Sequence, residues 1–191
     1  MSHAQAHHPL SEDEYLRQEA AADTKHEFVC GEAYAMAGAS ERHNRIALNI
    51  AYHLRNITRG KTCRAFMADM KLRIAASATF YYPDAMLVCD PADDHPLYKQ
   101  APCLIAEVLS PATATTDMRE KWQAYRALPS LRYYLLVDSE RPWTRAFFRK
   151  QGGDWFEQEL SREDVLNVEC DGVRLDLTLD DLYEDTGLLL V

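Results

Sequence analysis

The sequence has no hydrophobic run long enough to cross a membrane. A membrane helix needs about 20 consecutive apolar residues, and no stretch of this 191-residue chain approaches that length. The first ten residues carry histidines where a signal peptide would be apolar. These absences predict a soluble, cytoplasmic protein without a membrane partner.

Cysteine is scarce, and the copies are scattered. They never stand at the short spacing that a zinc knuckle or a redox motif requires, which argues against both kinds of site. We interpret them as small core residues in a reducing compartment. The five are Cys30, Cys63, Cys89, Cys103 and Cys170.

Positive charge is in deficit, with 21 Lys and Arg against 30 Asp and Glu and a net charge of −9. This balance argues against nonspecific attraction to a polyanion. One segment, Arg42 to Arg73, nevertheless carries eight basic residues against a single acid, Asp69. The segment is either a solvated face or a phosphate-facing surface, and the sequence leaves both interpretations open.

The chain contains neither a repeat nor a linker, so its length predicts one compact domain, residues 11–191, after a disordered tail, residues 1–10. A capping box of Ser11 and Glu14 begins a short helix. Further expected elements are a hairpin around Gly31-Glu32, a helix from Glu41 to Thr58, a strand from Phe66 to Ile74, and a strand from Phe80 to Cys89 followed by a polar loop.

The second half of the chain predicts a βαβ unit. The apolar strand Cys103 to Leu109 precedes a helix whose buried stripe is Met118, Trp122 and Tyr125, and a parallel strand, Tyr133 to Val137, follows. A closing hairpin, a short strand and a last helix complete a mixed α/β fold. Those three elements are expected at Thr144 to Leu160, Val173 to Leu177 and Leu179 to Tyr183.

Two acids stand where packing does not explain them. Asp84 follows Pro83 in one strand, and Glu107 interrupts the apolar strand that comes next. If these strands are neighbours, both carboxylates point to one side and repel unless a cation lies between them. Magnesium prefers such oxygen ligands. The structural alternatives are a turn cap for Asp84 and a buried arginine partner for Glu107.

The same acids belong to a set of motifs that resembles a known family. The set is Tyr82-Pro83-Asp84, Ala106-Glu107-Val108-Leu109-Ser110, Asp117, Lys121 and Tyr125, together with Glu27, the Gly31 turn and His43. It resembles the Uma-two family of endonucleases in the PD-(D/E)XK nuclease superfamily, from about Glu12 to Asp138. The resemblance implies a restriction-endonuclease-like fold, a mixed β-sheet flanked by helices.

Membership of that family would imply a metal site. Asp84, Glu107 and the Val108 carbonyl would bind Mg²⁺, or Mn²⁺ in its place, and Glu27 would complete the acidic cluster. The superfamily has a lysine two residues after the glutamate, where this chain has Leu109. We expect Lys121, on the following helix, to supply that charge.

The remaining candidates have strong structural alternatives. Asp117 is a supporting candidate that could simply pair with Lys121 four residues later. His43 is either a supporting candidate or a core histidine. Asp69 is a minor candidate for the site, because its strand alternation places it on a solvent-exposed face. The aromatic residues around the βαβ helix, Trp122, Tyr125, Tyr133 and Tyr134, are interpreted as core packing.

These features predict a magnesium-dependent endonuclease that hydrolyses DNA phosphodiester bonds. Cutting both strands of a duplex favours twofold symmetry, so we expect a homodimer. The alternative is an inactive nuclease-fold module that binds protein or nucleic acid without turnover.

Overall fold

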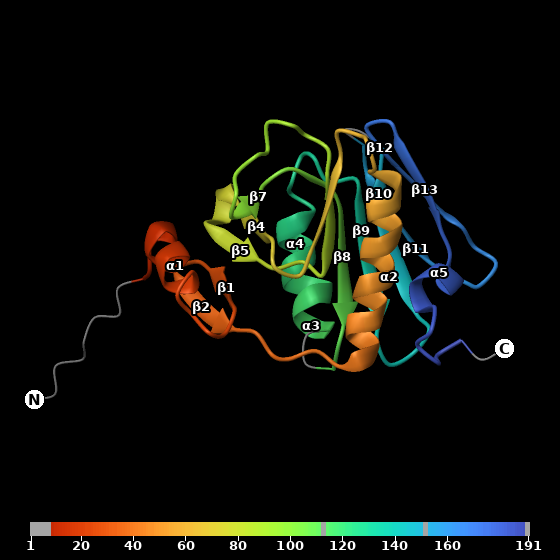
Figure 1. Cartoon of the computed structure of the whole chain (residues 1–191), viewed down its shortest axis with the longest axis horizontal. Coiled ribbons are helices and arrows are strands. Elements are labelled where there is room, and N and C mark those ends of the chain that lie inside the picture. Colours follow the sequence, from red (N-terminus) through yellow and green to blue (C-terminus); the bar gives the residue numbers. More distant parts are fainter. Residues whose placement is uncertain (1–8, 112–113, 151–152, 190–191) are drawn as a thin grey trace, which may run out of the picture.

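A six-stranded mixed sheet forms the centre of the molecule in the computed structural model, which describes residues 9–111, 114–150 and 153–189. The strand order is β11-β10-β9-β8-β6-β3, and β8 and β9 are its parallel pair (Figure 1). The strands are β3 (Arg64–Met67), β6 (Ala85–Val88), β8 (Pro102–Leu109), β9 (Tyr133–Asp138), β10 (Thr144–Arg149) and β11 (Trp155–Glu159).

Alternation along β8 divides the core into two layers. Leu104 and Ala106 pack in the same cluster as the apolar stripe of helix α2, whereas Ile105 and Leu109 pack with the aromatic residues of the βαβ connection. A strand places successive side chains on opposite faces, so each face of this buried strand has its own helical cover. Glu107 falls on the same face as Ile105.

Helix α2 (Glu41–Ile57) is the long helix that the sequence predicts. Ser40 accepts a hydrogen bond from the His43 N–H and caps its first turn. Ile46, Ile50 and Leu54 recur at helical spacing and are fully buried. The cap therefore fixes the start of α2, and with it the position of His43 in the first turn of the helix.

A second sheet has the strand order β2-β1-β5-β4-β7. It joins the N-terminal unit, which consists of α1, β1 and β2, to the body of the molecule. Helix α1 lies against this sheet, and Figure 1 shows α1, β1 and β2 together at one end of the molecule. The elements are α1 (Glu12–Glu19), β1 (His26–Val29), β2 (Glu32–Ala35), β4 (Lys71–Ile74), β5 (Thr79–Tyr81) and β7 (Tyr98–Lys99).

Two strands that the sequence predicts as continuous are each divided between the sheets. The stretch from Phe66 to Ile74 becomes β3 and β4, since Ala68 turns the chain with a φ of 42°. The stretch from Phe80 to Cys89 becomes β5 and β6, separated at Pro83-Asp84. Proline has no N–H to donate to a ladder, so the chain leaves one sheet there and enters the other.

The C-terminal part covers the α2 side of the central sheet. The predicted last strand is β13 (Val173–Leu177), and the predicted last helix is α5 (Leu179–Tyr183). Two further strands were not predicted from the sequence: β12 (Leu166–Cys170), which pairs with β13, and the short β7 within the expected polar loop. No helix in the described part of the chain is both long and apolar enough to span a membrane.

Leu10, which is predicted from the sequence to belong to the tail, contacts the folded domain. Leu10 donates its backbone N–H to the Gly31 carbonyl and packs against the cluster of Tyr15, Phe28 and Phe80. Residues 1–8, with their histidines, lie outside the described part of the chain. The ordered domain therefore includes the proline and leucine before the capping box.

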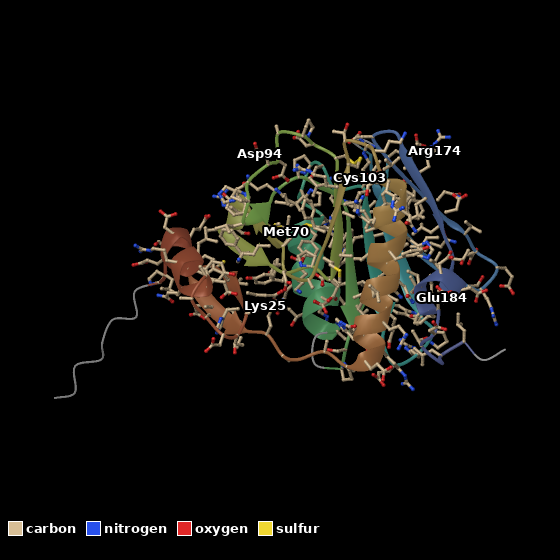
Figure 2. All side chains as sticks on the ribbon, viewed as in Figure 1. Lys25, Met70, Asp94, Cys103, Arg174 and Glu184 are labelled. Carbon is tan, nitrogen blue, oxygen red and sulfur yellow. A yellow bond between two sulfur atoms is a disulfide. The ribbon has the colours of Figure 1, made fainter. Side chains whose placement is uncertain are left out.

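Four of the five cysteines are core residues, as the sequence predicts, but they are disulfide-bonded and not free thiols, and Cys30 is not in the core. Cys63 is bonded to Cys89 and Cys103 to Cys170, all four in the buried core, and Cys103 is labelled in Figure 2, while Cys30 is free and exposed. Sequence spacing could not reveal these pairs, because separations of 26 and 67 residues are closed only by the sheet. The cysteines therefore give no support for a reducing compartment.

A thiol titration tests this pairing. In denaturant without reductant, only the Cys30 thiol is expected to react with a disulfide reagent, and all five thiols are expected to react after reduction. Reduction should also lower the melting temperature, since each crosslink contributes about 2–4 kcal/mol. Five reactive thiols before reduction would contradict both pairs.

Candidate active site

Asp84 and Glu107 converge on one face of the central sheet. Ala85 pairs with Ala106 in the antiparallel β6–β8 ladder, so the next position in that register places Asp84 opposite Glu107. Directly opposed residues in such a pair point to the same face. The Val108 N–H donates to Asp84 Oδ2 at 2.7 Å, which fixes the aspartate against β8.

Glu107 is a buried carboxylate with two partners. Only 2% of its surface is exposed. The Tyr125 hydroxyl donates to Glu107 Oε1 at 2.8 Å, and the Lys121 ammonium lies 3.3 Å from the same oxygen. Burial raises the pKa of Glu107 well above its ordinary value, while the nearby Lys121 charge opposes that rise. Its partner is thus the helical lysine and not an arginine.

Lys121 joins three carboxylates. Its Nζ lies 2.9 Å from Glu27, 3.1 Å from Asp117 and 3.3 Å from Glu107. Burial alone would lower the Lys121 pKa, but the charges of Glu107, Asp117 and Glu27 outweigh it and raise the pKa well above its ordinary value. Lys121 therefore stays protonated at neutral pH.

The helix that carries Lys121 differs from the expected one. It begins as α3 (Ala114–Thr116), passes through a π-helical turn (Asp117–Lys121) and ends as α4 (Trp122–Tyr125). The wider turn changes the buried stripe, so that Asp117 and Lys121 are buried and Met118 is exposed. Regular helical spacing could not predict this, and π-turns occur frequently at functional sites.

Glu27 approaches the cluster from the other sheet. It lies on β1, and its Oε1 atom accepts a 3.4 Å hydrogen bond from the Tyr82 N–H in addition to its contact with Lys121. Glu27 is therefore not an exposed residue of the hairpin, since its side chain is 16% exposed and paired with Lys121. Lys121 links the N-terminal unit to the central sheet through this contact.

His43 contacts Asp84 from the first turn of α2. Its Nε2 atom lies 3.4 Å from Asp84 Oδ2, and the ring is also close to the Val108 carbonyl. Burial acts to lower the His43 pKa, but the contacts with Asp84 and Val108 prevail and raise it. His43 thus touches both the carboxylate and the carbonyl proposed as metal ligands.

These side chains line a cleft of about 840 Å³. Its floor holds Asp84, Glu107 and Lys121, and its walls come from the N-terminal unit and the start of α2. No arginine of the basic segment from Arg42 to Arg73 lines it in the described part of the chain. Several of these arginines are paired elsewhere, for example Arg73 with Glu12 and Arg45 with Glu41.

The donor set suits a hard cation. Three carboxylates, those of Glu27, Glu107 and Asp117, contact the Lys121 ammonium, and a fourth, that of Asp84, lines the same cleft. Within the described residues no group of three or more acidic, histidine or cysteine side chains is placed to hold a metal ion by itself. Magnesium often needs only one or two carboxylates, since waters and substrate oxygens complete its shell. An open Mg²⁺ site at Asp84, Glu107 and the Val108 carbonyl stays a prediction.

The family model described as "Uma2: Putative restriction endonuclease" matches residues 12–180. The chain belongs to the Uma2 family. Two Synechocystis proteins are similar to this Uma2 chain. Uncharacterized protein slr1290 is 33% identical over 175 residues, 91% of each chain. Uncharacterized protein sll1609 is 39% identical over 132 residues, 68% of this chain and 75% of the relative.

A solved structure shares the fold of the Uma2 chain. It is the crystal structure described as "a putative nuclease belonging to DUF820" from Anabaena variabilis, with a TM-score of 0.69 and 15% identity over 92% of this chain and 98% of that one. The fold class predicted from the sequence, a restriction-endonuclease-like mixed sheet flanked by helices, is confirmed. The resemblance to the family is confirmed with it.

Sequence reasoning missed one polar contact of the Uma2 site. Tyr125 was expected to serve core packing, and its ring does pack at 5.6 Å from Tyr81, but its hydroxyl also donates to Glu107. The position of Tyr125 four residues after Lys121 is the signal that could have revealed this, because residues at that spacing share a helix face.

Proposed function

We propose that this Uma2 protein is a magnesium-dependent endonuclease that hydrolyses DNA phosphodiester bonds. The observation that carries the proposal is the meeting of Asp84, Glu107 and a protonated Lys121 on the floor of one cleft. A buried carboxylate costs several kcal/mol unless it is compensated. Buried carboxylates that are kept together in a cleft are typical of a functional site.

Each residue has a distinct proposed role. Asp84, Glu107 and the Val108 carbonyl would hold the ion, and His43 would position Asp84 and Val108 through its contacts with both. Glu27 and Asp117 would hold Lys121 in place. A bound Mg²⁺ would supply a more acidic water and neutralise charge on the phosphate.

Lys121 would act by its charge and not as a base. A lysine that removes a proton must be neutral, which requires a lowered pKa, whereas the carboxylates around Lys121 raise its pKa. Its ammonium can instead stabilise the negative charge that develops on the phosphate oxygens. The geometry supports this role without movement of the helix, since Nζ already reaches the floor of the cleft.

Calorimetry with Asp84→Asn tests the metal site. The parent chain is expected to bind Mg²⁺ and Mn²⁺ and to nick supercoiled plasmid DNA. The Asp84→Asn variant should bind Mg²⁺ about tenfold or more weakly, because a charged ligand is lost, and should not nick. The exposed Asp94→Asn is a matched control outside the cleft. Retained ion uptake and nicking by Asp84→Asn would contradict the proposal.

A second function has one observation in its favour. Lys121 already neutralises part of the acidic cluster without an ion, as a noncatalytic nuclease-fold module would require. Such a module would show no metal uptake, and Asp84→Asn would leave its binding to protein or nucleic acid unchanged. The twofold assembly and the cytoplasmic location expected from the sequence stay predictions, which sedimentation and cell fractionation can test.

A further inference from the structure

We propose that Lys25 is a substrate-binding residue that contacts a DNA phosphate beside the one to be cleaved. The inference rests on the proposed function, and it concerns the rim of the same cleft. Lys25 lies before β1 where the N-terminal unit meets the body of the molecule (Figure 2), and its side chain is 46% exposed.

Most of the charged side chains that line the cleft are acidic, so few cations are available there to bind a phosphate. The acids that line it are Glu27, Asp84, Glu107, Asp117 and Glu120. Within the described part of the chain, Lys25 and Lys121 are the two lysine or arginine residues that line it. Lys121 is already engaged by three carboxylates. A polyanion that enters this cleft therefore meets Lys25 as its accessible permanent cation.

The position of Lys25 matches the repeat of a nucleic acid backbone. Lys25 and Glu27 are two residues apart on an extended segment, and both line the cleft. Two steps along a strand span about 6.6 Å. Phosphates along one strand of a duplex rise by about 3.4 Å per nucleotide. If one phosphate lies near Lys121, which contacts Glu27, a phosphate one or two nucleotides away comes within reach of Lys25.

A DNA phosphate can replace the present ion-pair partner of Lys25. Lys25 forms an ion pair with Asp69, whose side chain is 82% exposed. Exposed pairs of this kind contribute little to stability, so the exchange for a phosphate costs little. The Lys25 ammonium also lies 5.8 Å from the centre of the Tyr82 ring, itself a lining residue. Asp69 and Tyr82 thus keep the ammonium at the rim when no DNA is bound.

Fluorescence anisotropy with a short labelled DNA duplex tests the inference, with Ca²⁺ in place of Mg²⁺ to prevent cleavage. Lys25→Ala is expected to weaken binding about fivefold and to reduce the salt slope of log Kd by about 0.9, as for one lost phosphate contact. Lys61→Ala is the matched control, because Lys61 is exposed beyond the far end of α2 and does not line the cleft. Asp69→Asn should tighten binding, since it frees Lys25.

The outcomes separate this inference from the proposed function. Equal slopes for Lys25→Ala and the parent chain, or no binding by the parent chain, would overturn the role of Lys25. If the parent binds duplex but does not nick DNA with Mg²⁺, the proposed function fails while a reduced Lys25→Ala slope still supports the inference. In an active enzyme, Lys25→Ala should raise KM with kcat nearly unchanged.

Discussion

Replacement of Lys121 by methionine is expected to lower the free energy of unfolding at neutral pH by about 3–5 kcal/mol, the usual cost of leaving buried charges unpaired. Methionine keeps an unbranched side chain, one atom shorter than that of lysine, and removes its charge. Glu27, Glu107 and Asp117 would then face one another without a cation. Denaturant unfolding monitored by circular dichroism measures the loss.

The loss should depend on pH with a definite sign. Burial raises the folded-state pKa of Glu107 above its ordinary value of 4.5, so protonation of this group favours the folded state. That contribution is fully present below about pH 4.5 and is lost as the pH rises through the folded-state pKa. Lys121→Met should therefore cost little near pH 4 and most at neutral pH.

The control for this variant is Lys61→Met, a change at an exposed lysine. It should leave the free energy of unfolding within about 0.5 kcal/mol of the parent value at both pH values. A Lys121→Met loss that is the same at pH 4 and pH 7 would mean that packing, and not the three carboxylates, accounts for it. A pH-dependent loss supports the charge cluster directly.

Replacement of Glu107 by glutamine is expected to reduce DNA nicking by about a thousandfold or more, the scale of losing a central electrostatic group. Glutamine has the same shape and can still accept the hydrogen bond from the Tyr125 hydroxyl. It removes a buried negative charge whose pKa burial already raises. The melting temperature should consequently be unchanged or higher, while Mg²⁺ uptake falls.

The contrast between activity and stability makes this variant informative. Glu157→Gln is a suitable control, because Glu157 is exposed on β11, far along the sheet from β8. It should change neither nicking nor melting temperature. Full nicking by Glu107→Gln would refute the metal site. A large fall in melting temperature would instead indicate a structural role for Glu107.

Local patterns in the sequence determined a large part of this protein. Periodicity and caps were enough for α2, for the β10–β11 hairpin and for α5, because their contacts lie within one helix or one turn. The buried run of β8 made Glu107 conspicuous, and the proline before Asp84 marked the other acid. The parallel β8–β9 pair followed from the helix that connects them.

The tertiary structure decided the features that depend on distant partners. The division of Phe66–Ile74 and of Phe80–Cys89 between two sheets depends on which neighbours each half finds, and the two disulfides depend on the same sheet registers. The π-helical turn brought Lys121 and Asp117 into the buried stripe, and β1 brought Glu27 to them. Hydrophobic patterning records which face of an element is buried, but it does not record which charged groups meet there, since charges are matched by long-range packing.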